Sequence, residues 1–230
     1  MPPVTLAGIR TRRRPRRASA GAVPIAYVQN NYATPQSPQT SVSVTYKGPQ
    51  TAGSLNVVVV GWRDTTAVVN AVTDSKGNVY TRAVGPTAVA GLLSQSIYYA
   101  KNIAAATANA NTVTVQFNVA AQYADIRILE YSGLDPADPV DVTAAATGKK
   151  ATSSTPAANT TKANDLLFGD NIVNTTTAAP GSGLTNRVIT TPDGDIAEDR
   201  IVKTTGRYST SARLSSSGPW VMQLVAFRGL

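Results

Sequence analysis

Aromatic side chains within short apolar stretches are the residues of this 230-residue chain best suited to binding chemistry. Tyr and Trp rings stack on the apolar faces of sugars, while nearby amide, carboxylate and guanidinium groups bond to sugar hydroxyls. Trp62 ends a valine-rich stretch, and Tyr98 and Tyr99 are adjacent, so that in a strand they point to opposite faces. We expect ligand contacts from Trp62, Tyr99 and Tyr123, although most strand aromatics form core.

A cluster of four acids surrounds a glycine turn in the segment PDGDIAED, and its members are Asp193, Asp195, Glu198 and Asp199. Carboxylate oxygens at such density offer the ligands that calcium prefers, although the spacing is not that of an EF-hand. A solvated turn, with Asp193 and Gly194 forming the bend and Arg200 neutralising part of the charge, explains the same residues. Calcium is the single cofactor that the sequence suggests.

The chain has no histidine and no cysteine. Ser-His-Asp and Cys-His nucleophiles, imidazole bases, thiolate zinc sites and disulfides are therefore excluded. A glycan-active enzyme needs two carboxyl groups across a cleft. Glu130, in the apolar segment 125–131, is the best single candidate, but it is equally explained as an outward-facing strand residue, and no second glutamate has a comparable context. We therefore expect no catalytic residue.

Positive charge is concentrated before Pro24, in residues 1–24, as Arg10, Arg12, Arg13, Arg14, Arg16 and Arg17. Residues 25–230 carry 15 basic and 13 acidic side chains, so the formal charge of +8 belongs mainly to the first segment. Interspersed prolines predict a flexible arm or linker, and its arginines are suited to phosphates of nucleic acid or to a neighbouring subunit. No signal peptide and no membrane-spanning apolar run is recognisable.

From residue 25 onward, short apolar segments alternate with Gly, Pro, Asn and Asp, and this pattern is typical of strands in a sandwich or barrel. Segment 55–62 (LNVVVVGW) is expected to be a central strand covered on both faces, and segment 71–84 a hairpin with its turn at 74–77. Segments 41–46, 94–100, 112–119 and 125–131 complete a set of strands. We predict an all-β fold: a single jelly-roll-like sandwich of two mostly antiparallel sheets.

Similar segments recur in the same order along the chain. Segment 165–173 corresponds to 55–62, 195–203 to the strand around Ile97, 208–214 to 112–117, and 221–230 (VMQLVAFRGL) to 125–134 (DIRILEYSGL). These matches suggest a pseudo-repeat of residues 41–141 and 165–230, with 143–164 as the crossover; chance similarity of short strands is the alternative. The apolar final segment, 220–227, is expected to lie centrally in a sheet.

The body also resembles a bacterial extracellular domain that occurs singly or in tandem in large secreted and surface proteins. The resemblance rests on VVVVGWRDTTA (57–67), VTDSKGNVYTRAVGPT (72–87), SQSIYYAKNI (94–103), DIRILEYSGLDPADPVD (125–141), PDGDIAEDRIV (192–202) and WVMQLVAFRGL (220–230). It implies a jelly-roll-like sandwich of the sort used as a carbohydrate-binding or adhesive module, located outside the cell or on its surface.

The sequence thus favours a non-catalytic extracellular binding or adhesion module whose partner is a polysaccharide or cell-surface glycan. The main alternative is a self-assembling coat or filament subunit whose basic arm contacts nucleic acid or a neighbouring copy, because icosahedral virus coat proteins often combine such an arm with a β-sandwich. A carboxylate-dependent glycan-active enzyme is the third hypothesis.

Overall fold

Eighteen strands and their connecting loops make up the part of the chain that the structure, a computed structural model, describes: Met1 and residues 23–230. The first half contains β1 (Ala26–Ala33), β2 (Gln39–Thr45), β3 (Leu55–Trp62), β4 (Val69–Asp74), β5 (Thr81–Val89), β6 (Leu93–Ala100), β7 (Thr112–Ala121) and β8 (Asp125–Ser132). The second contains β9 (Val140–Gly148), β10 (Thr152–Ser154), β11 (Ala158–Asn159), β12 (Asp165–Val173), β13 (Thr177–Pro180), β14 (Thr185–Ile189), β15 (Ile196–Val202), β16 (Arg207–Tyr208), β17 (Ser211–Leu214) and β18 (Trp220–Arg228).

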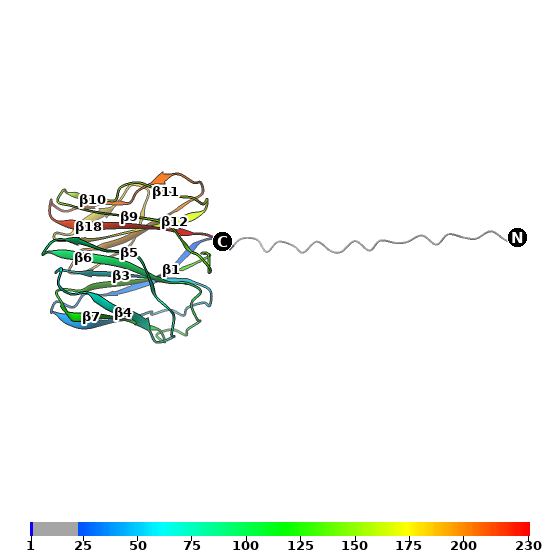
Figure 1. The fold of residues 1–230 in the computed structure, drawn as a ribbon, viewed down its shortest axis with the longest axis horizontal. Helices are drawn as coiled ribbons and strands as arrows, with labels where there is room; N and C mark the ends of the chain where they lie inside the picture. The colour runs from blue at the N-terminus through cyan, green and yellow to red at the C-terminus, as the bar shows by residue number, and fades with distance from the viewer. Residues whose placement is uncertain (2–22) are drawn as a thin grey trace.

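These strands form antiparallel sheets stacked in four layers, which Figure 1 shows edge-on. The outer layer of the first half is a three-stranded sheet of order β2-β7-β4, and the layer beneath it is a five-stranded sheet of order β1-β8-β3-β6-β5. Next come the five-stranded sheet β14-β15-β12-β18-β9 and an outer layer of β10-β17-β13 and β11-β16. The predicted all-β, antiparallel class is confirmed, but the described residues form five sheets rather than two.

Successive apolar side chains of the central strands point to opposite faces of their sheet and fill the spaces between layers. In β3, Val58 and Val60 face the outer sheet of their half, whereas Val57 and Val59 face the second half. Every residue of β3 is buried, which confirms the prediction of a strand covered on both faces. β12 repeats this arrangement, with Phe168 directed to the first half and Leu167 to the outer layer. Three apolar cores therefore lie between four layers.

The two halves have the same strand order. Each strand of the first half has a counterpart at the same place in the corresponding sheet of the second half. In the five-stranded sheets the order β1-β8-β3-β6-β5 corresponds to β9-β18-β12-β15-β14, and in the three-stranded sheets β2-β7-β4 corresponds to β10-β17-β13. β11 and β16 are the two strands without a counterpart. The segment correspondences drawn from the sequence match these pairs of strands. The predicted bounds of 41–141 and 165–230 are wrong, however, because the first half begins with β1 at Ala26 and the second with β9 at Val140.

The halves meet through their five-stranded sheets. At one edge Asn30 of β1 donates a hydrogen bond to the carbonyl of Arg187 in β14, and towards the other edge Gln223 of β18 donates to the carbonyl of Gln95 in β6. β5 lies against β9. Corresponding strands of the two halves therefore lie at opposite edges of the interface, as they do between the subunits of a two-fold dimer.

The predicted hairpin over 71–84 is wrong. β4 pairs with β7 and β5 pairs with β6, so that the chain crosses from one layer to the next between them. The turn itself exists, because Gly77 has a φ of 73° and donates to the carbonyl of Asp74. The Asp74 carboxylate also accepts from Asn78 and Tyr80, which closes the loop locally while the strands diverge.

The predicted crossover over 143–164 is also wrong, because it contains most of β9 together with β10 and β11. Small Ala and Thr side chains give β9 a weak hydrophobic signal, yet it pairs with β18 along nearly its whole length. The prediction for 220–227 is confirmed, since β18 lies between β12 and β9.

Candidate functional site

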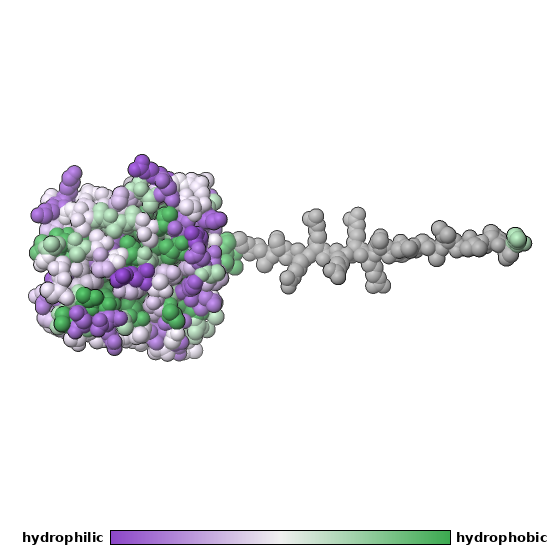
Figure 2. All heavy atoms as spheres, viewed as in Figure 1, coloured by the Kyte–Doolittle hydropathy of each residue, from purple (hydrophilic) through white to green (hydrophobic). Residues whose placement is uncertain are grey.

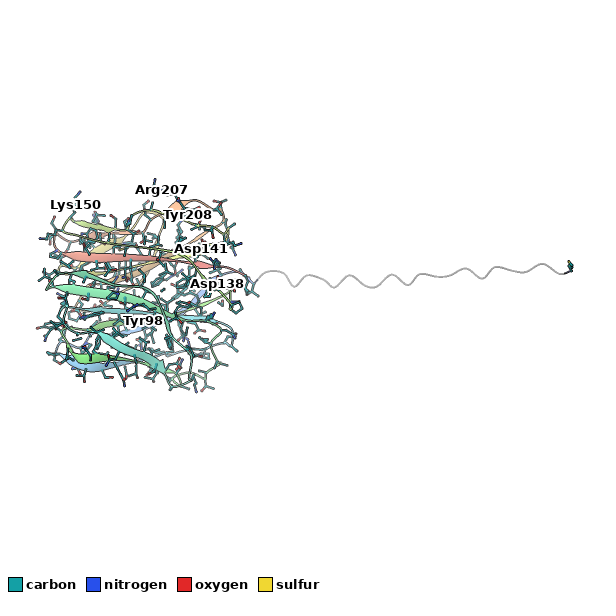
Figure 3. The ribbon with its side chains drawn as sticks, viewed as in Figure 1. Tyr98, Asp138, Asp141, Lys150, Arg207 and Tyr208 are labelled. Carbon is teal, nitrogen blue, oxygen red and sulfur yellow. The ribbon has the colours of Figure 1, made fainter. Side chains whose placement is uncertain are left out.

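A pocket opens beside Trp62 on the side of the first half. Its volume is about 130 Å³, and its lining comes from β3, the loop before β4, and strands β4, β5 and β6. The lining residues are Trp62, Thr65, Ala67, Val68, Val69, Arg82, Pro86, Ala88, Ser94, Ser96 and Tyr98. Figure 3 places Tyr98 between the ribbons of β6 and β4, and Figure 2 shows apolar residues exposed in this part of the same face.

The pocket follows from the unequal widths of the stacked sheets. β5 extends the five-stranded sheet instead of joining β4. The outer sheet therefore has only three strands with which to cover a sheet of five, and part of the outer face of β5 and β6 stays open. Alternation along β6 then directs Ser94, Ser96 and Tyr98 towards that face, where they line the pocket. The same alternation directs Ile97 and Tyr99 towards the second half.

Two deeply buried polar groups of the pocket have no protein partner. Within residues 23–230, no group accepts the indole N–H of Trp62 and none bonds to the hydroxyl of Ser96. Both residues are almost fully buried, with exposed fractions of 2% and 1%. Trp220, in contrast, donates its indole N–H to the carbonyl of Lys150, and Ser94 donates to that of Asp64. Since buried polar groups are normally satisfied, the pair beside the pocket is suited to a ligand.

Arg82 contributes positive charge at the edge of the pocket. It is the cross-strand partner of Tyr98, so both side chains lie on the same face of the β5–β6 pair. Burial raises the pKa of Tyr98, and the nearby Arg82 guanidinium offsets part of that rise. The pocket therefore combines an apolar floor with several hydrogen-bond donors and one cation.

The three aromatic residues predicted to bind a ligand are not brought together. Trp62 lines the pocket, but its ring also packs edge-on against Phe117 in the core. Tyr99 packs against Phe227 between the two halves. Tyr123 is exposed in the loop between β7 and β8, with a φ of 43°. The pocket uses Tyr98 instead, and the sequence signal for it was the alternation of Ser94, Ser96 and Tyr98.

The acidic cluster is buried rather than solvated, and its members point in different directions. Asp195 accepts from the backbone N–H of Val173, and Asp199 accepts from Tyr131 and from the Arg187 guanidinium. Glu198, on the opposite face of β15, accepts from the backbone of the loop after β13. Asp193 lies near Gln36 and Arg63. Among the described residues, no three carboxylates are placed to hold a metal ion together.

A buried ionic cluster instead lies between the halves, around Arg127 of β8. Its guanidinium pairs with Asp125 at 2.9 Å and donates to the carbonyl groups of Asn171 and Ile196. Burial raises the pKa of Asp170 to about 8, and the pKa of Asp195 well above its ordinary value. Burial therefore favours the neutral form of both carboxyl groups.

Glu130, the candidate for enzymatic chemistry, is fully buried at the opposite end of the first half from Trp62. Its carboxylate accepts from the side chains of Gln29 and Gln50 and from the backbone of Thr51. It is neither outward-facing nor in the pocket, and its partners connect β8 to β1 and to the loop after β2. The arrangement has the character of a structural network.

The six arginines of the predicted arm lie outside the described residues. Within the described part of the chain there is no helix long and apolar enough to cross a membrane. No family model, curated protein or solved structure matches this chain.

Proposed function

We propose that this chain is a non-catalytic binding module and that each half is a jelly roll. The support is the strand order: β1-β8-β3-β6 in one layer and β2-β7-β4 in the other arise when two interleaved Greek keys wrap around one core. The departure from that arrangement is β5, which joins β6 rather than β4. This departure is what leaves the pocket beside Trp62 open.

The proposed ligand is a sugar ring at the end of, or within, a polysaccharide. The observation that carries this proposal is the pair of buried donors without partners, the indole N–H of Trp62 and the hydroxyl of Ser96, at an apolar pocket. A cavity of roughly 150 Å³ accepts benzene. The pocket, at about 130 Å³, therefore has room for one face or edge of a sugar ring, with the remainder of the ring outside it. The apolar face of the ring packs on Val69, Ala88 and Tyr98, while its oxygens accept from the two donors.

A glycan-array screen of the full chain tests this function. Ala88→Phe places a large ring in the pocket, and Ala90→Phe, at the exposed turn two residues further on, is the matched control outside it. We expect selective glycan binding that Ala88→Phe abolishes and Ala90→Phe retains. Binding that survives Ala88→Phe, or no glycan binding by the folded chain, would contradict the proposal. Calcium in a parallel array tests whether the acids of segment 193–199 contribute.

A self-assembling subunit is the second candidate, because viral capsid proteins and lectins share jelly-roll strand orders. Light scattering of the full chain separates the two. Large, uniform particles, with 260 nm absorbance where the arginine arm carries nucleic acid, would favour assembly; a monodisperse monomer favours the binding module. An extracellular, adhesive role belongs to the same proposal and rests on the resemblance of the strand and turn motifs.

A further inference from the structure

Two groups of the pocket lining can only donate, the indole of Trp62 and the guanidinium of Arg82, and no lining side chain can only accept. Besides these two groups, the lining offers only hydroxyl groups, and no aspartate, glutamate or side-chain amide is among the lining residues. Neutral sugars are usually bound by acceptors as well as donors, because each sugar hydroxyl carries a proton to be satisfied. A donor-rich site is better matched to a ligand that is rich in acceptors.

Arg82 also lacks a carboxylate partner. Of the eight arginines among the described residues, four form ion pairs within 4 Å and four, Arg82, Arg200, Arg207 and Arg213, form none with any described residue. Arg82 is the one of these four that lines the pocket. Its position opposite Tyr98 is set by the register of β5 and β6. A guanidinium in this position can bind a planar carboxylate through two parallel N–H···O bonds.

We infer that the pocket selects a sugar that carries a carboxylate, that is, a uronic acid; this inference rests on the proposed function. The carboxylate pairs with Arg82, the ring covers the apolar floor beside Tyr98, and a ring or hydroxyl oxygen accepts the indole N–H of Trp62. Ser96 supplies a further donor, for which Gly85 leaves room: a Cβ at Gly85 would lie 2.6 Å from the Ser96 hydroxyl oxygen. Every polar group of this arrangement then has a partner.

Calorimetric titration of the full chain with oligogalacturonate and with a neutral galacto-oligosaccharide of equal length tests this inference. Because a charge-assisted hydrogen bond is stronger than a neutral one, we expect the uronate to bind about tenfold or more tightly. Arg82→Gln is expected to abolish the preference, and Arg82→Lys to restore part of it. Arg207→Gln, which removes the same charge from an exposed arginine of β16 outside the pocket, is the control and is expected to leave the preference unchanged.

Salt provides a second measurement. The preference is expected to shrink as ionic strength rises well above about 150 mM, because Arg82 is exposed and screened by solvent ions. Equal affinity for the two oligosaccharides, or a preference that survives Arg82→Gln, would overturn the inference while leaving sugar binding intact. Failure of both oligosaccharides and of every glycan on the array would overturn the proposed function as well.

Discussion

Asp170 provides a quantitative test of the interface between the two halves. Its carboxyl group is fully buried on β12, where it accepts a hydrogen bond from Gln95 across the interface. Burial is the main reason that its pKa rises from 3.8 to about 8, with nearby Asp125 adding to the rise and Arg127 opposing it. In the unfolded chain the same group has its ordinary pKa and is ionised at neutral pH.

Between about pH 4 and pH 8 the folded state therefore binds one proton more than the unfolded state at this group. Stability from Asp170 is complete below the unfolded pKa and is lost as the pH rises towards the folded pKa. Each pH unit in that interval changes the free energy of unfolding by about 1.4 kcal/mol per proton, which amounts to ~3 kcal/mol between pH 5 and pH 7.

Asp170→Asn mimics the protonated carboxyl, because its amide oxygen can still accept from Gln95 while the group cannot ionise. Urea denaturation at pH 5 and pH 7, followed by tryptophan fluorescence, should show the variant gaining ~3 kcal/mol relative to wild type on going to the higher pH. Asp138→Asn, at a mostly exposed carboxylate, is the control and should show little change. A variant that is less stable than wild type by the same amount at both pH values would refute the reasoning, because it would mean that Asp170 is ionised beside Arg127.

Two further predictions concern the central strand of the second half and the contact between halves. Removing residues 220–230 deletes β18, which pairs on both sides, and should abolish cooperative thermal unfolding measured by circular dichroism; a retained sharp transition would contradict this. Tyr131→Phe removes a 2.7 Å hydrogen bond to the Asp199 carboxylate and should lower the free energy of unfolding by about 1.5–3 kcal/mol in urea denaturation. Tyr208→Phe, which removes an exposed hydrogen bond on the outer layer, should cost less than about 1 kcal/mol. Equal losses in the two variants would count against a special role for the interface.

Local pattern was sufficient to predict many strands of this chain but not the assignment of strands to sheets. The valine run of β3 and the apolar end of the chain indicated central strands, because burial on both faces leaves no polar alternation. The segment around Gly77 has the turn residues of a hairpin, yet its flanking strands join different sheets. The neighbour with which a strand pairs depends on long-range packing, and the residues of the turn do not determine that pairing.

The same distinction applies to the candidate site. Alternation showed that Tyr98 and Tyr99 face opposite sides of a strand, but not which side would lie beside a pocket. That depended on β5 joining β6, a pairing with two irregularities in register. The acids of 193–199 resemble a surface cluster in the sequence because charge is usually exposed. In the structure all four are buried, Asp193 and Asp195 in the turn before β15 and Glu198 and Asp199 within β15, with Arg187 against Asp199.

The most direct test of the central claim uses the two tryptophans of the chain as internal reporters. In a ¹H–¹⁵N spectrum of the labelled full chain, each indole N–H gives one resonance. Titration with oligogalacturonate should shift the resonance of Trp62, whose N–H has no partner among the described residues, and leave that of Trp220, which is bonded to Lys150, in place. An unmoved Trp62 resonance at saturating ligand, or movement of Trp220 alone, would contradict the assignment of the pocket beside Trp62 as the binding site.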